Sequence, residues 1–138
     1  MVRSFLPKPT DSELEILRIL WDRGPSSVRD VHGELEKSKS SGYTTTLKLM
    51  QIMLEKGILS RDVSGRNHVY TPTVSKDHTQ QQMVDRMIST VFNGSPFMLV
   101  MQALGRKRPS QEEISRIKSY LNELEKERKE RPQEGKKK

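Results

Sequence analysis

The sequence contains no cysteine among its 138 residues. Structural disulfides, cysteine-ligated zinc sites and thiol catalysis are therefore excluded together. No apolar run approaches the roughly 18 residues that a transmembrane helix requires. The first residues, MVRSFLPKPTD, lack the apolar segment and the cleavage site of a signal peptide. We therefore expect a cytoplasmic protein without membrane insertion.

Apolar residues are also scarce. They make up 32% of the chain and aromatic residues only 5%, whereas charged residues reach 31%, above the usual share of about a quarter. A chain of this length fits one or two small domains, and so few apolar residues do not suffice for a single large core. We expect thin helical layers, or a core that a second subunit completes.

The net charge of +7 is unevenly distributed along the chain. Residues 126–138 contain seven Lys or Arg against three Glu, whereas residues 10–73 contain nine charges of each sign. A basic terminal stretch is more often solvated than a binding element, so we predict that residues 126–138 form a basic, disordered tail. If residues 10–73 bind nucleic acid, their positive groups must be gathered on one face.

Start and stop signals divide the first part of the chain into three helices. The first helix follows a capping box, Thr10-Asp11-Ser12-Glu13, and ends at Gly24-Pro25. We expect Ser27 to cap the second helix and Thr44 to cap the third, which ends at Gly57. In the third helix the apolar residues other than Ile52 fall within one arc, so the opposite face is free to meet a partner.

Two short extended runs, residues 58–63 and 68–73, surround the turn Ser64-Gly65-Arg66-Asn67, a pattern typical of a β-hairpin. Three helices and a hairpin within about 65 residues form the outline of a winged helix-turn-helix. The sequence therefore predicts a mainly α fold with a small β-hairpin. A winged helix-turn-helix DNA-binding domain occupies residues 10–73, after an N-terminal arm, residues 1–9.

The pattern becomes helical again after a predicted hinge, residues 74–78. Helices are expected over residues 79–92 and 97–104, and a last helix follows a second capping box at Ser110. Apolar residues of that last helix recur at spacings of three, four and three, an a/d seam that favours self-association. We assign residues 79–125 to a helical dimerisation domain. Its predicted dimer contacts are Met87, Val91, Ile114, Ile117, Leu121 and Leu124.

Four stretches resemble the penicillinase repressor (BlaI/MecI) family of bacterial regulators, over about residues 10–125. They are TDSELEILRILW (10–21), YTTTLKLMQIMLEKGIL (43–59), GRNHVYTP (65–72) and FNGSPFMLVMQAL (92–104), in the family's order and spacing. The resemblance implies a homodimer that represses its target by binding an inverted repeat in double-stranded operator DNA. It also implies induction when a membrane sensor protease, triggered by a β-lactam, causes cleavage within the C-terminal domain.

The start and outer face of the third helix contain the candidate DNA contacts. Helix-terminal amides and the hydroxyls of Thr44 and Thr45 suit phosphate, and Lys48 can reach a base edge or another phosphate. Arg66 at the hairpin tip is placed to reach the adjacent backbone or minor groove, as wings commonly do. The alternative for these residues is an ordinary helix cap, a solvated helix face and an exposed turn.

Three positions leave two interpretations open. Tyr43 either contacts phosphate through its hydroxyl or packs to anchor the turn. Ile52 either contacts a thymine methyl or extends the core, and family members often carry Arg at its position, so a different operator is expected. The family's cleavage region, carried over through the resemblance at residues 92–104, falls near Gln102-Ala103. These two residues equally fit a buried helix.

No grouping of residues suggests catalysis, a cofactor or a metal. The three histidines, His32, His68 and His78, come from different elements and lack ligand spacing, and no nucleophile–base pair is visible. The missing cysteines also exclude the Cys-x-Cys switch of copper-responsive relatives. Two alternatives to an operator-binding repressor remain. One is a ligand-sensing winged-helix regulator with a small-molecule pocket, which the few aromatic residues disfavour; the other is a winged-helix protein-interaction module.

Overall fold

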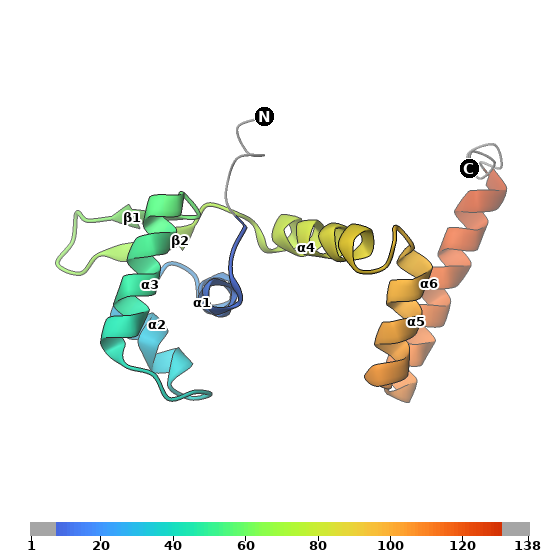
Figure 1. Cartoon of the computed structure of the whole chain (residues 1–138), viewed down its shortest axis with the longest axis horizontal. Coiled ribbons are helices and arrows are strands. Elements are labelled where there is room, and N and C mark those ends of the chain that lie inside the picture. Colours follow the sequence, from blue (N-terminus) through green and yellow to red (C-terminus); the bar gives the residue numbers. More distant parts are fainter. Residues whose placement is uncertain (1–7, 131–138) are drawn as a thin grey trace. The chain divides into compact units, whose positions relative to one another are not determined.

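The computed structural model describes residues 8–130 and divides the chain into two compact units, residues 1–85 and 86–138. The described part is mainly α-helical with one small hairpin, as the sequence predicts (Figure 1). Its elements are α1 (Asp11–Arg23), α2 (Val28–Leu35), α3 (Tyr43–Lys56), β1 (Leu59–Asp62), β2 (Val69–Pro72), α4 (Lys76–Thr90), α5 (Pro96–Arg106) and α6 (Gln111–Glu130). Within residues 8–130, every helix is too short or too polar to span a bilayer.

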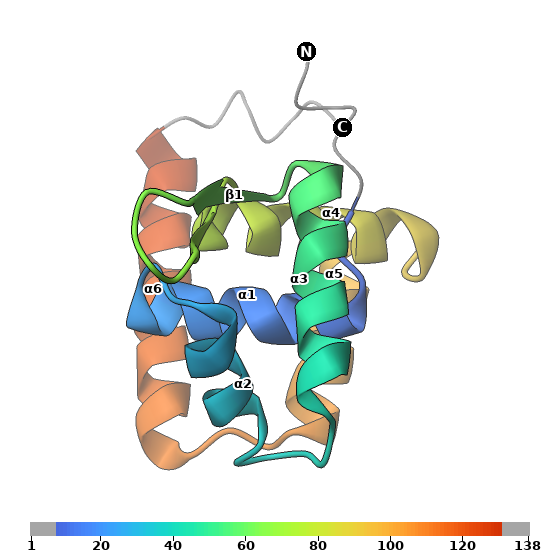
Figure 2. The same cartoon turned by 90° about the vertical axis from the view of Figure 1, so that its left-hand side faces the viewer.

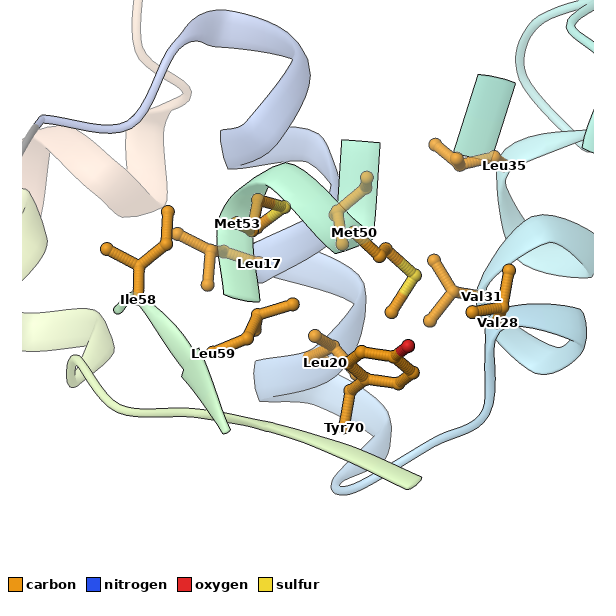
Figure 3. Close-up of a cluster of buried hydrophobic side chains, with 11 residues drawn as sticks. Leu17, Leu20, Val28, Val31, Leu35, Met50, Met53, Ile58, Leu59 and Tyr70 are labelled. Carbon is orange, nitrogen blue, oxygen red and sulfur yellow. The ribbon is translucent and has the colours of Figure 1, made fainter. Parts of the chain in front are cut away.

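The first unit has its own hydrophobic core, built from α1, α2, α3 and the hairpin. Each helix presents a narrow apolar stripe to it, because apolar residues recur every three or four positions. Leu17 and Leu20 of α1 lie beside Met50 and Met53 of α3, and Tyr70 of β2 closes the cluster (Figure 3). Burial of these side chains fixes the orientation of α3 relative to α1 and α2.

The hairpin has the winged-helix form. β1 pairs antiparallel with β2, with Leu59 opposite Pro72 and Asp62 opposite Val69, so Pro72 occupies the strand end where its missing N–H costs little. A further bridge, which the sequence did not indicate, joins Ser26 to Tyr70 through hydrogen bonds of 3.1 and 2.8 Å. The segment between α1 and α2 is thereby tied to the base of the wing.

Helix caps agree with the sequence at two of the first three helices. Thr10 and Glu13 form the expected reciprocal capping box, and the Ser27 hydroxyl accepts the amide hydrogen of Asp30. The predicted cap of α3 is wrong, because Gly42 is the N-cap and Thr44 lies inside the first turn. Gly42 is extended, and its carbonyl accepts the amide hydrogens of the third and fourth residues after it, so the helix starts two residues earlier.

Residues 86–130 of the second unit contain the end of α4, then α5 and α6. Asn93 and Gly94 adopt positive φ values of 51° and 84° and end α4. Ser95 caps α5, with Pro96 in its first turn. Ser110 caps α6, as the sequence predicts. None of the side chains in residues 86–130 is fully buried in the single chain.

Two predicted boundaries need correction. Residues 76–78 of the predicted hinge form the first turn of α4, because the Ser75 hydroxyl accepts the amide hydrogen of His78 and caps an earlier start. Residues 126–130 of the predicted disordered tail belong to α6, where oppositely charged residues four positions apart favour a helix. The rest of that tail, residues 131–138, and residues 1–7 of the predicted arm lie outside the described residues.

Candidate nucleic-acid interface

One face of α3 is exposed and carries polar side chains. Thr44 and Lys48 are exposed there, and Gln51 and Glu55 continue the same strip. Positions three and four apart lie above one another on a helix, so these four side chains form a single ridge. Thr46, Met50 and Met53 occupy the opposite, buried side. Sequence reasoning missed Gln51, although helical spacing from Lys48 would have placed it on the ridge.

A groove of about 460 Å³ lies between the start of α2, the start of α3 and the hairpin. These three elements stand together at the front of Figure 2. Tyr43 and Leu47 of α3 line one wall, Arg29 of α2 a second, and Arg66 with His68 of the hairpin a third. The groove therefore brings Arg66 of the wing to the same concave surface as the start of α3.

Ion pairing separates the nine Lys and Arg residues of positions 10–73 into two groups. Arg23, Lys37, Lys39 and Lys56 each lie within 4.0 Å of a carboxylate. Among the described residues, no such pair involves Arg29, Lys48 or Arg66, nor Arg18 of α1 and Arg61 of β1. Three of these five cations therefore surround α3 and the groove, although positive and negative residues balance over 10–73.

Tyr43 and Ile52 are placed differently from each other. The Tyr43 side chain lines the groove and is 45% exposed, and its ring meets that of His32 edge-on at 5.6 Å. Ile52 is half-buried beside the polar ridge, and it is not among the side chains packed against the core cluster. Tyr43 therefore packs against His32 and still exposes part of its side chain at the groove. The packing of Ile52 does not support a role in extending the core.

Two polar clusters that the sequence did not indicate attach α3 to the other helices. At its start, Thr46 is fully buried and its hydroxyl lies 3.0 Å from Nδ1 of His32 in α2. At its end, Lys56 Nζ lies 2.9 and 2.8 Å from the two carboxylate oxygens of Glu13, a residue only 2% exposed. Both connect residues distant in sequence, which local patterns do not reveal.

The hairpin turn is ordered by Asp62. Its Oδ1 accepts the backbone N–H of Ser64 at 2.9 Å and the Ser64 hydroxyl at 2.8 Å. These hydrogen bonds favour the charged form, so they hold the pKa of the Asp62 carboxyl below its ordinary value of 3.8. Ser64 lies two residues before Arg66 in the same turn, and the carboxylate therefore helps to shape the tip of the wing.

Apolar side chains of the second unit remain accessible in the single chain. Met87, Val91, Leu121 and Leu124 are between 42% and 65% exposed, and Ile114 and Ile117 are half-buried. The predicted scissile residues Gln102 and Ala103 are exposed on α5, so the chain alone does not bury them. Among residues 8–130, no three His, Asp or Glu side chains are placed to hold a metal ion.

Comparisons of the chain with a family profile and with individual known proteins point to the same family. The profile of the penicillinase repressor family matches residues 9–123. The penicillinase repressor of Bacillus licheniformis is 26% identical over 125 residues, covering 91% of this chain and 98% of its own length. The transcriptional regulator BlaI of Mycobacterium tuberculosis is 28% identical over 117 residues, covering 83% of each chain.

A solved structure is similar to part of the chain. It is a solution structure of monomeric B. licheniformis BlaI in complex with the blaP half-operator. The match has 28% sequence identity and a TM-score of 0.47, and it covers 52% of this chain and 88% of that one.

Proposed function

The chain belongs to the penicillinase repressor family, a family of transcriptional repressors rather than enzymes, and from this premise we propose that it binds inverted-repeat operator DNA as a homodimer. The observation that carries the proposal is the placement of Arg29, Lys48 and Arg66. These cations have no carboxylate within 4.0 Å among the described residues, and they surround an exposed helix and a groove beside it.

DNA binding through this surface combines two kinds of contact. The amides at the start of α3, the hydroxyls of Thr44 and Thr45, and Arg66 on the wing suit phosphate oxygens, which position the protein. Lys48 lies farther along the ridge and suits a base edge in the major groove. Tyr43 adds its hydroxyl at the groove, and the half-buried Ile52 suits the methyl group of a thymine. A protein that binds operator DNA acts where the genome lies, so we place this protein in the cytoplasm.

Dimerisation follows from the apolar surface of the second unit. Exposed patches of this kind mark association sites, and the spacing of Ile114, Ile117, Leu121 and Leu124 is that of a two-helix seam. Two copies joined in this way present two reading helices to the two halves of an inverted repeat. The second half-site is then bound at high effective concentration.

Derepression by proteolysis fits the same arrangement. Gln102 and Ala103 lie on α5 of the second unit, away in sequence from every residue proposed to touch DNA. A cut there by a membrane sensor protease, or by a protease that it activates, leaves the reading surface intact and removes the dimer contacts of α6.

Charge-removing substitutions test the DNA interface. Lys48→Ala and Arg66→Ala should each weaken operator binding. Each substitution that removes a phosphate interaction should also lower the slope of log affinity against log salt by roughly one. If Lys48 reads a base, its replacement should relax specificity at one position of each half-site. Arg18→Ala removes the same charge from α1 and should leave affinity nearly unchanged.

The experiment is a gel-shift or fluorescence titration at several salt concentrations. Equal affinity of wild type, Lys48→Ala and Arg66→Ala would remove the proposed reading surface. A wild-type protein that binds no DNA at low salt would instead favour a winged-helix protein-interaction module.

A further inference from the structure

His32 occupies the junction between α2 and the start of α3. Its side chain is only 12% exposed. Nδ1 lies 3.0 Å from the Thr46 hydroxyl, Nε2 lies 3.1 Å from a carboxylate oxygen of Glu36, and the ring meets Tyr43 edge-on. One side chain of α2 therefore touches two residues in the first turns of α3.

The start of α3 needs such support. Its N-cap is Gly42, which has no side chain to accept the free amides of the first turn, and no capping hydrogen bond from a side chain is formed there. A helix end without a cap frays more readily. This first turn also contains Thr44 and Thr45, which are proposed to contact phosphate.

The hydrogen-bond roles of His32 follow from its partners. The Glu36 carboxylate can only accept, so Nε2 carries a hydrogen and donates it. In the neutral ring Nδ1 is then an acceptor, and the Thr46 hydroxyl donates to it. Thr46 is fully buried, so without His32 its hydroxyl loses this interhelical partner inside the protein.

We propose that His32 is a positioning residue for DNA recognition, which holds the uncapped first turn of α3 in its DNA-binding position through Thr46 and Tyr43. The inference rests on the proposed function. The fixed turn presents Thr44, Thr45 and the amides of α3 together, so ordering is completed before DNA binds and affinity is gained.

Four substitutions separate the Thr46 hydrogen bond from the other interactions of His32. Thr46→Val removes the hydroxyl at nearly constant volume, and Thr46→Ser retains it. His32→Ala removes every interaction, whereas His32→Asn keeps a polar atom near the position of Nδ1 and does not reach Glu36. We expect Thr46→Val and His32→Ala each to weaken operator binding about tenfold. Thr46→Ser and His32→Asn should stay within about threefold of wild type.

The measurement is the operator dissociation constant at a temperature where circular dichroism shows every variant to be folded. Val31→Ala, in the buried face of α2, is the matched control, because it destabilises the same helix but leaves the hydrogen bonds of His32 in place. It should leave operator affinity unchanged. The double variant His32→Ala/Thr46→Val should bind no more weakly than the weaker single variant, since both single variants already remove the hydrogen bond between Thr46 and His32.

Amide hydrogen exchange of Thr45 and Thr46, whose N–H groups donate to the Gly42 carbonyl, gives a second readout. Exchange should accelerate there in His32→Ala and Thr46→Val, with the rest of α3 protected as in wild type. Unchanged affinity and exchange in these variants, or an equal loss of affinity in Val31→Ala, would overturn the role of His32. The proposed function fails separately, if the wild-type protein does not bind DNA.

Discussion

Glu13 has two roles that sequence rules treat separately. Its side chain accepts the backbone N–H of Thr10 at 3.0 Å, as a capping box requires, and both its oxygens meet Lys56, 43 residues later. Capping is local, so the sequence Thr-Asp-Ser-Glu was enough to predict it. The ion pair depends on the packing of α1 against α3, which no short pattern encodes.

Loss of Lys56 should therefore destabilise the first unit strongly. Lys56→Met leaves the Glu13 carboxylate buried without its cation, and we expect a loss of about 3 kcal/mol in the free energy of unfolding. Urea denaturation followed by circular dichroism measures it. Lys37→Met removes a cation whose pair with Glu34 is exposed, and this control should cost under about 1 kcal/mol. Similar losses in the two variants would contradict the role of the Glu13–Lys56 pair.

The Asp62 carboxyl makes the stability of the hairpin depend on pH. Its pKa is lower in the folded protein than the ordinary 3.8, so the charged form stabilises the fold. That contribution is complete at pH values above 3.8 and is lost as the pH falls through the lower, folded pKa. An NMR titration of Asp62 should have its midpoint below 3.8. Ser64→Ala removes the hydroxyl donor and should raise that midpoint; an unchanged midpoint would assign the shift to another cause.

At the scale of elements, glycine has opposite effects in two helices. Gly33 lies in the middle of α2, is exposed, and a Cβ built on it would meet no atom within 4 Å. Gly57 ends α3 with a φ of 87°, a conformation that disfavours other residues. The first glycine weakens its helix, and the second provides a turn that the chain needs before β1.

Alanine substitutions should separate these two effects. We expect Gly33→Ala to raise the free energy of unfolding by about 1 kcal/mol, because it removes backbone freedom without a clash. Gly57→Ala should lower it by about 1 kcal/mol or more. Thermal or urea unfolding of both variants measures the difference, and a destabilised Gly33→Ala would mean that α2 requires glycine for a reason not visible in the fold.

The elements were predictable where local chemistry decides them. Capping boxes, the glycine stop after α3 and the hairpin turn all depend on residues within four positions of each other. The start of α3 was not predictable in the same way, because Thr44 has a hydroxyl that can cap a helix, whereas the N-cap is Gly42, which has none. In the structure α3 starts earlier, and Thr46 near its start is hydrogen-bonded to His32 of α2. This hydrogen bond and the Ser26–Tyr70 bridge both join residues that are distant in sequence.

For the whole molecule, the ridge of α3 and the wing tip could be predicted as separate features, but their meeting could not. Helical spacing placed Lys48 on the outer face, and the turn placed Arg66 at the tip. The groove brings Arg66 to the start of α3, with Arg29 on its second wall, and it requires the packing of α2 and the bridge to the wing. Pairing of the other cations with carboxylates is likewise a property of the fold.

Association of the second unit should be separable from folding of the first. Replacing Ile117 and Leu121 together by Asp places two charges on the proposed seam, and monomers should result because burial of those charges is costly. Sedimentation velocity measures the change, and the free energy of unfolding of residues 10–73 should be preserved. Wild-type protein that is monomeric at micromolar concentration would rule out the proposed dimer.

Removal of the dimer contacts by truncation should reproduce the effect of the proposed cleavage. A chain ending after Met101 retains the core of the first unit and every proposed DNA contact, but it lacks α6. Each winged helix then binds one half-site without the high effective concentration that dimerisation supplies, so operator affinity should fall at least about tenfold. Affinity for an isolated half-site should stay close to that of the full chain, which distinguishes reduced avidity from a damaged reading surface. A truncated protein that binds the complete operator with full affinity would show that dimerisation is not the switch.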